Sequence, residues 1–224
     1  KSYRLFMESL EIILKAWTQT AFTHKGEFYE FPVPGWKETN RFLKPLEEEY
    51  HNKDGEYSAM YVHPRPYQQP HPPVWLMSNA PHTYKIAAEK GFNVIGMSSP
   101  PNKLLSCWDA YCSVDSVNGK TLKRGDGVGV CVVIYVAETM EEADKTIRPA
   151  INGYYEYLSG SRPEGGWTRK AYLDDDAEPT DEDLNGEWFD FLMKYDLIWV
   201  GTTDYVAEKI EKYRQLIGLK HIML

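Results

Sequence analysis

The feature that most constrains this chain is the regular alternation of short apolar segments with amphipathic segments from residue 74 onward. Four apolar segments are predicted to be strands, at 74–77, 93–97, 128–137 and 220–224. Helices are predicted at 81–90, 104–114, 139–158, 187–198 and 201–217. Strands that alternate with helices indicate parallel βα units, and strands this apolar are usually covered on both faces. The pattern predicts an α/β fold with about half of an eight-unit barrel, because a complete barrel needs roughly 250 residues.

The first 73 residues follow another pattern. Apolar residues recur at helical spacing over Met7–Trp17, which predicts an amphipathic helix. Residues 24–31 alternate around Gly26 and are predicted to form a hairpin arm. Eight prolines fall within 32–73, too many for a helix, yet the segment is too apolar for a linker. We expect an ordered, functional insert there and a second, polar insert at 159–186, both within a single domain spanning 1–224.

Composition excludes several classes of protein. The net charge is −8, from 25 Lys and Arg against 33 Asp and Glu, so binding to a nucleic-acid backbone is not expected. No apolar stretch is long enough to span a membrane. Three cysteines make no complete disulfide framework, which favours a cytoplasmic location. The chain begins without Met and ends on an apolar segment, so we expect it to be part of a larger domain.

Several motifs together resemble the bacterial luciferase-like monooxygenase family. The most specific are Tyr67–Trp75 (YQQPHPPVW) and Ala80–Gly91 (APHTYKIAAEKG), a proline-rich lead-in to a strand and the helix that follows it. Phe6–Ile13 (FMESLEII), Gly26–Tyr29 (GEFY) and Gly201–Glu208 (GTTDYVAE) are also similar to stretches of that family. The resemblance covers nearly the whole chain except residues 35–60 and 159–186.

This resemblance implies a TIM-type (β/α)₈ barrel of which the chain carries roughly strands five to eight. It implies a flavin-dependent monooxygenase that oxygenates an organic, apolar substrate with O₂. The cofactor would be reduced flavin mononucleotide (FMN) from a separate flavin reductase, with the deazaflavin coenzyme F420 as the alternative. Other possibilities are an F420-dependent hydride-transfer enzyme and a non-catalytic flavin-binding or partner subunit. We expect a homo- or heterodimer, and catalytic residues on strands that precede this chain.

The turn after the strand at 74–77 is the strongest local candidate for cofactor binding. A helix begins there, and its free N–H groups and dipole attract phosphate. Ser78 and Thr83 add hydroxyl donors, while Asn79 and Ala80 are small enough for close approach. By its match to the family motif, this turn is the flavin phosphate site. The alternative is an ordinary βα turn in which Ser78 and Thr83 only cap the helix.

Other candidates are weaker. Ser98 follows the next strand, where the family contacts the flavin ring, but it is equally suited to capping the helix after Pro100. His82 is expected to face solvent, and no His, Cys or carboxylate spacing indicates a metal site. The acidic run over 174–183 is expected to be a solvated loop. For any single aromatic residue near the two inserts core packing is favoured, but as a group they favour an apolar pocket capped by both. They are Trp36, Tyr57, Tyr61, Tyr67, Trp188, Phe189, Phe191, Tyr195 and Trp199.

Overall fold

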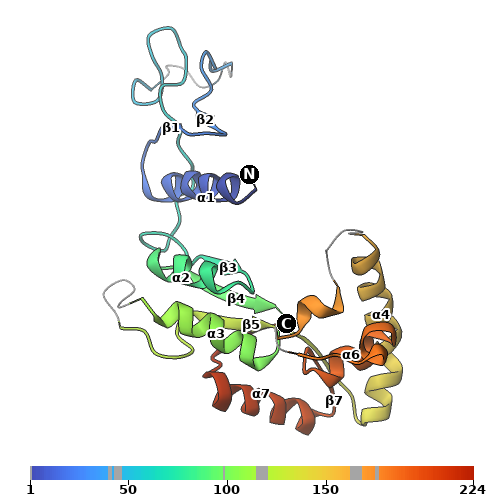
Figure 1. The fold of residues 1–224 in the computed structure, drawn as a ribbon. Helices are drawn as coiled ribbons and strands as arrows, with labels where there is room; N and C mark the ends of the chain where they lie inside the picture. The colour runs from blue at the N-terminus through green and yellow to red at the C-terminus, as the bar shows by residue number, and fades with distance from the viewer. Residues whose placement is uncertain are drawn as a thin grey trace. The chain divides into compact units, whose positions relative to one another are not determined.

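The computed structural model describes residues 2–39, 42, 47–97, 99–114, 121–161, 168–174 and 177–224. The chain forms two compact units, Lys1–Pro73 and Val74–Leu224, and each is described by itself. Figure 1 follows the chain from the blue N-terminus to the red C-terminal segment. Within the described ranges, no helix combines the length and the apolarity needed to span a bilayer.

The first unit begins with helix α1 (Ser2–Thr18), which confirms the amphipathic helix expected near the start. Strands β1 (His24–Lys25) and β2 (Glu30–Phe31) pair antiparallel and confirm the hairpin. Each strand of the hairpin has only two residues, and a buried carboxylate supplies further hydrogen bonds to the turn between them.

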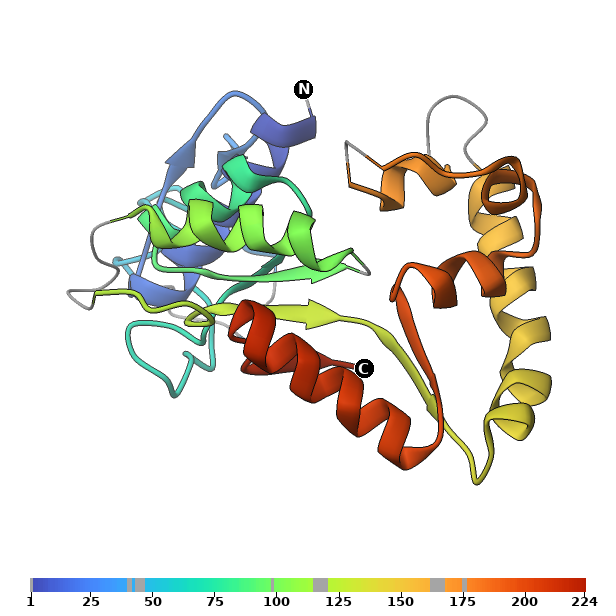
Figure 2. The ribbon, with the colours of Figure 1, turned by 60° about the horizontal axis from the view of Figure 1, so that its bottom comes forward.

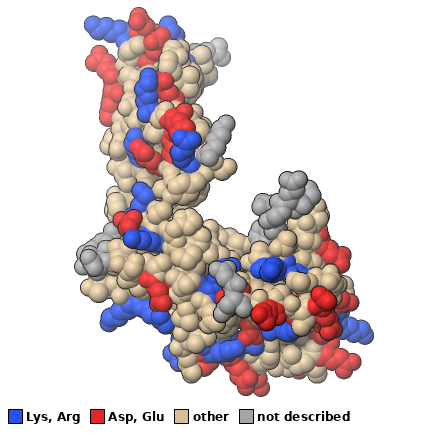
Figure 3. Space-filling model, viewed as in Figure 1, with Lys and Arg blue, Asp and Glu red and all other residues tan. Residues whose placement is uncertain are grey.

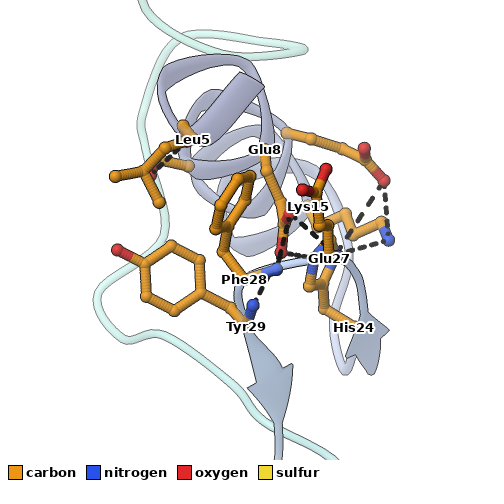
Figure 4. Close-up of polar contacts among 9 residues, drawn as sticks. Leu5, Glu8, Lys15, His24, Glu27, Phe28 and Tyr29 are labelled. Carbon is orange, nitrogen blue, oxygen red and sulfur yellow. Dashed lines mark hydrogen bonds and ion pairs between the residues drawn. The ribbon is translucent and has the colours of Figure 1, made fainter. Parts of the chain in front are cut away.

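That carboxylate belongs to Glu8 of α1 and organises the tip of the hairpin (Figure 4). Its two oxygens accept hydrogen bonds from the backbone N–H groups of Glu27, Phe28 and Tyr29 at 2.8–3.1 Å. His24 Nε2 lies 3.1 Å from Glu8 Oε1. Burial alone would raise the pKa of Glu8, but the hydrogen bonds from His24 and the three backbone groups outweigh it and hold the pKa below its usual range.

The contacts of His24 fix its tautomer. Lys15 Nζ lies 3.2 Å from His24 Nδ1, and an ammonium group can only donate, so Nδ1 accepts and Nε2 carries the hydrogen that faces Glu8. The turn needs a glycine for space. A Cβ at Gly26 would lie 2.2 Å from Glu8 Oε1 and 2.6 Å from His24 Nε2.

The described part of the proline-rich insert is held by aromatic contacts and isolated backbone bridges. Trp36 packs on Tyr57 with ring centroids 4.6 Å apart, and Tyr50 packs on Tyr61 at 4.3 Å. The Tyr57 hydroxyl donates to the carboxylate of Glu38, which, together with burial, raises the pKa of Tyr57 to about 12. These contacts explain how a segment with little regular structure stays ordered, as expected from its composition.

The second unit contains a parallel sheet of four strands in the order β3 (Trp75–Met77), β4 (Asn93–Met97), β5 (Val128–Cys131) and β8 (His221–Met223). Helices α2 (Pro81–Glu89), α3 (Pro101–Cys112) and α7 (Thr203–Ile217) connect or follow these strands. Helix α7 ends at Gly218, whose φ of +69° is the left-handed conformation that favours glycine. Four parallel strands of a barrel-like sheet confirm the expected fold class.

The two faces of this sheet differ. The face covered by α2, α3 and α7 carries Val94, Val128 and Val130, all of which are buried. The opposite face, here called the inner face, carries Trp75 and Met77, of which 37% and 51% remain exposed. The described strands do not close into a barrel, because β3 and β8 are edge strands. The inner face is the one that a closed barrel would enclose.

A lobe follows the sheet along the chain. Strand β6 (Val133–Val136) pairs in parallel with β7 (Ile198–Gly201), and α4 (Met140–Gly160) packs on α6 (Trp188–Lys194). In Figure 2 the yellow strand of the sheet runs on toward α4. The core of the lobe contains Ile151, Tyr155, Trp188, Phe189, Phe191, Leu192, Leu197 and Ile198.

Two predicted elements in this region were wrong. The predicted strand 128–137 is two strands, β5 and β6, because its first half pairs with β8 and its second half with β7. The predicted helix 187–198 ends at Lys194, and the apolar residues that follow form β7. Asp196 separates the two with a left-handed φ of 57°, which a helix interior does not allow.

The acidic run over 174–183 is not simply a solvated loop, although residues 175 and 176 lie outside the described part of the chain. A short helix η1 (Arg169–Tyr172) precedes it, and helix α5 (Asp181–Asn185) forms within it. Asp183 is buried. It accepts from Lys194 Nζ at 2.6 and 2.8 Å and from the Tyr195 hydroxyl at 3.0 Å, and its pKa is lowered chiefly by Lys194.

Asp196 is also held by charge. Lys209 and Lys212 of α7 both donate to its carboxylate. Burial alone would raise the pKa of Asp196, but these two hydrogen bonds lower it further than burial raises it. The ion pairs fix the turn between α6 and β7 against the last helix.

The hairpin geometry predicts the effect of Glu8→Gln. The amide nitrogen of Gln donates and so replaces one acceptor with a group that repels the backbone N–H groups it faces. We expect the amides of Glu27, Phe28 and Tyr29 to exchange with deuterium faster than in the unaltered protein. Glu48→Gln, at an exposed position elsewhere in the first unit, is the control. Unchanged protection at residues 27–29 would contradict this role of Glu8.

The Asp196 pairs predict a pH-dependent loss of stability. Because the folded pKa of Asp196 is lowered, its contribution is present above the unfolded pKa of about 3.9 and is lost as the pH falls through the folded pKa. Asp196→Asn should lower the free energy of unfolding by about 1.5–3 kcal/mol at pH 7. The difference should shrink toward pH 3 in urea titrations. Exposed Asp204→Asn should cost less than about 1 kcal/mol, and a constant difference at all pH values would refute the assignment.

Candidate functional site

The candidate site lies at the edge of the sheet where the parallel strands end. The turn after β3 contains Ser78, Asn79 and Ala80 and leads into α2. Ser98, which follows β4, lies outside the described residues, so its predicted contact with the flavin ring stays a prediction. Ser99 beside it is buried, and its hydroxyl donates to the Met97 carbonyl at 2.8 Å.

Asn79 joins this turn to the neighbouring strand. Its Nδ2 donates to the Met97 carbonyl at 2.8 Å, and its Oδ1 accepts from the Met97 N–H at 2.7 Å. The side chain thus pairs with both polar groups of one backbone residue, as a strand partner would. The sequence predicted Asn79 as a small residue that allows close approach. In the structure its side chain also joins the ends of β3 and β4, and its place in the cofactor site stays a prediction.

Ser78 stabilises the same turn from within. Its N–H donates to the Ile95 carbonyl at 3.0 Å, and its hydroxyl oxygen accepts from the Ala80 N–H at 3.1 Å. The hydroxyl therefore shapes the approach to α2 without capping the helix. Its hydrogen remains available as a donor, because this bond uses only the oxygen.

The first turn of α2 has the features of an anion site. Ala80 is the N-cap residue and makes no side-chain cap, and Pro81 has no N–H. Thr83 N–H donates to the Ala80 carbonyl at 2.9 Å. The N–H of His82, at the second helical position, has no acceptor within the helix. The alternative in which Ser78 and Thr83 cap this helix is not seen in the described residues.

Thr83 and His82 form the outer wall of this turn. Thr83 is half-buried, and its hydroxyl lies 3.4 Å from His82 Nε2. His82 is exposed, as expected from the sequence. The two side chains add polar groups beside the start of the helix, where the dipole is positive.

The turn rests on a packed layer that sequence analysis did not identify. Tyr84 is fully buried, and its hydroxyl has no hydrogen-bond partner among the described residues. It lies against the backbone of β4, since a Cβ at Gly96 would come 2.8 Å from it. Burial raises the pKa of Tyr84 above its usual range, and burial raises that of nearby Cys107 to about 11. The single glycine inside the apolar strand β4, Gly96, was the sequence signal that could have indicated such a close approach.

The second insert reaches the same end of the sheet. Lys103, in the first turn of α3, donates to the backbone carbonyls of Ala171 and Leu173 at 3.3 and 3.4 Å. The described segment 168–174 therefore lies beside the start of α3. On the face drawn in Figure 3, cationic and anionic side chains are interspersed over the described surface rather than gathered by sign.

The aromatic residues divide between core and surface. Trp188, Phe189, Phe191 and Trp199 are buried in the second unit, which agrees with core packing for each of them, and a pocket capped by both inserts stays a prediction. Arg169 covers part of this cluster, with its guanidinium carbon 4.5 Å from the ring centroid of Trp188. Tyr67 in the first unit is 97% exposed.

Comparisons with known proteins agree with the fold. Residues 1–220 match the family described as luciferase-like monooxygenase. An uncharacterized protein of Sinorhizobium fredii is 30% identical over 86 residues, which are 38% of this chain and 25% of that protein.

Solved structures are similar at lower identity. The oxygenating constituent of 3,6-diketocamphane monooxygenase of Pseudomonas putida, a type II Baeyer–Villiger monooxygenase in complex with FMN, is 22% identical with a TM-score of 0.61, over 100% of this chain and 56% of that one. An F420-dependent secondary alcohol dehydrogenase is 12% identical with a TM-score of 0.56, over 97% and 54%. The chain thus spans about half the length of these structures, and the likeness shows a shared fold.

The Asn79 bridge predicts a measurable cost when it is removed. Asn79→Ala leaves the N–H and carbonyl of Met97 without this partner and should lower the free energy of unfolding by about 1–3 kcal/mol. Asn79→Asp keeps the acceptor but repels the Met97 carbonyl, so its cost should be intermediate. Exposed Asn185→Ala is the control in chemical unfolding. An equal effect of the two alanine variants would show that the bridge does not stabilise the turn.

Proposed function

Because the chain belongs to the luciferase-like monooxygenase family, we propose that it forms part of a flavin-dependent monooxygenase that oxygenates an organic, apolar substrate with O₂. The observation that carries this proposal is the turn between β3 and α2, which offers free donors at a helix start beside the ends of parallel strands. Cofactors bind at this end of barrel sheets.

The residues of the turn fit the phosphate of FMN. The uncapped start of α2 offers the His82 N–H, and the hydroxyls of Ser78 and Thr83 can donate to phosphate oxygens. Ala80 presents no side chain that would block the backbone. Ser98 is proposed to contact the flavin ring from the next strand. When bound, reduced flavin supplies the electrons with which one oxygen atom of O₂ enters the substrate and the other leaves as water.

The inner face of the sheet supports an apolar substrate. Strands β3, β4, β5 and β8 contain no Asp, Glu, Lys or Arg. Trp75 and Met77 leave apolar surface exposed on this face. Asn93 and His221 are the polar side chains of these four strands, so a charged group placed there would lose hydration and meet few polar partners.

A second candidate is an F420-dependent hydride-transfer enzyme, which is favoured by the fold shared with the F420-dependent alcohol dehydrogenase. A non-catalytic flavin-binding or partner subunit is the third. A reductase that supplies reduced FMN, a homo- or heterodimer and a cytoplasmic location belong to the main proposal. Cys107, Cys112 and Cys131 are all free thiols, which suits a reducing compartment. Anaerobic titration with reduced FMN and with reduced F420 separates the cofactors.

Thr83 gives the sharpest test of phosphate binding. A hydroxyl bond to a charged phosphate contributes about 1.5–3 kcal/mol, so Thr83→Ala should weaken FMN binding roughly tenfold to a hundredfold. Riboflavin, which has no phosphate, should bind nearly as before. The measurement is anaerobic titration of the protein that carries this chain with each reduced flavin.

Matched variants separate recognition from folding. Thr83→Ser keeps the hydroxyl and should retain most of the affinity. Ala80→Glu places a carboxylate beside the phosphate and should be worse than Thr83→Ala. Equal losses for FMN and riboflavin would mean that the turn supports the fold and not phosphate recognition.

A further inference from the structure

The inner face of the sheet carries a row of three sulfur-containing side chains at the ends of adjacent strands. Met97 of β4 is in register with Cys131 of β5, and Cys131 is in register with Met223 of β8. Residues in register on neighbouring strands point to the same face. We call Met97, Cys131 and Met223 the sulfur row. The function proposed above uses the apolar surface of this face for the substrate and gives the three sulfur atoms no role of their own.

The geometry of the row suits one ion. Neighbouring strands are about 4.8 Å apart, roughly twice a metal–thiolate bond of about 2.3 Å. An ion bound to the Cys131 sulfur therefore has a methionine within reach on each side. Methionine is flexible enough to turn its thioether toward such an ion. Within the described residues, Met97 and Cys131 are half-buried and Met223 is 42% exposed.

The chemistry of the row selects the type of ion. The four strands contain no carboxylate, and the Asn93 amide lies at the opposite end of β4 from Met97, so the row itself offers no side-chain ligand to hard cations such as Mg²⁺ or Ca²⁺. Thiolate and thioether ligands select Cu(I). One thiolate also balances the single positive charge, which leaves a neutral complex on an apolar face.

We propose that Met97, Cys131 and Met223 form a binding site for one Cu(I) ion. The Cys131 thiol loses its proton to solvent as the copper–sulfur bond forms, and copper stays in the same oxidation state. The sequence shows no spacing of His, Cys, Asp or Glu that is typical of a metal site. In the described part of the chain no three of those residues form a metal cluster, and the row depends on methionine instead. The proposal does not rest on flavin binding.

The other cysteines provide matched controls. Cys107 lies on the buried side of α3, and its thiol donates to the Asn79 carbonyl at 3.5 Å. Cys112 lies at the end of the same helix, and burial raises its pKa. Neither belongs to a strand of the sheet. If any thiol could bind copper, substitution of Cys112 would therefore reduce copper uptake, whereas uptake by the sulfur row would not change.

The test is a competition titration of the whole, cofactor-free chain under anaerobic, reducing conditions. Cu(I) is supplied as its coloured bicinchoninate complex, and loss of colour reports copper transferred to the protein. We expect transfer of one equivalent. Cys131→Ser should abolish it, and Met97→Leu and Met223→Leu should each lower the affinity at least about tenfold. Cys112→Ser and Met60→Leu, which lie outside the row, should behave like the unaltered protein.

Circular dichroism of each variant checks folding. If Cys131→Ser does not fold, the two methionine variants decide the question, because exchange of Met for Leu conserves volume. Failure of the unaltered chain to take copper would overturn the proposal. So would an equal loss in Cys112→Ser and Cys131→Ser, or unchanged affinity in both methionine variants.

Discussion

Parallel pairing of β3, β4, β5 and β8 is the constraint on which the candidate site depends. It brings the carboxyl ends of segments that are far apart in sequence to one edge, where the Ser78–Ala80 turn, Ser99 and the sulfur row all lie. Backbone pairing with β4 ends at the Ser78 N–H, and the Asn79 side chain continues it by bonding both polar groups of Met97. The start of α2 is therefore positioned by side-chain hydrogen bonds as well as by the sheet.

Each unit also contains a buried carboxylate whose hydrogen bonds hold a segment that has few backbone pairs. Glu8 binds three consecutive backbone N–H groups of a hairpin, and Asp183 joins a capped helix to Lys194 and Tyr195. Burial of such a charge costs free energy unless its lone pairs are occupied, and both carboxylates have their oxygens occupied. The same kind of interaction thus orders two short segments that contain little regular backbone pairing of their own.

Much of the fold could be predicted from the sequence where local pattern decides structure. β4 begins at Asn93 and ends at Met97 as predicted, and α2 differs from its prediction by one residue, because turn and helix signals flank both. The division at Val132 and the strand β7 could not be predicted, because an apolar run does not reveal which strand pairs with it. For the site, the sequence identified the turn but not the bridge from Asn79 to Met97, which depends on a residue 18 positions away.

The division of the run 128–136 has a mechanical consequence. One extended segment serves two sheets, since β5 pairs within the barrel-like sheet and β6 pairs with β7 in the lobe. Side chains alternate along an extended segment, so one inserted residue near Val132 would turn every later side chain to the opposite face. Val133–Val136 would then lose their match to the lobe core while β5 kept its own. The length of this segment therefore couples the orientation of the lobe to the register of the sheet. We expect insertions or deletions in it to be tolerated less well than in the loops around it.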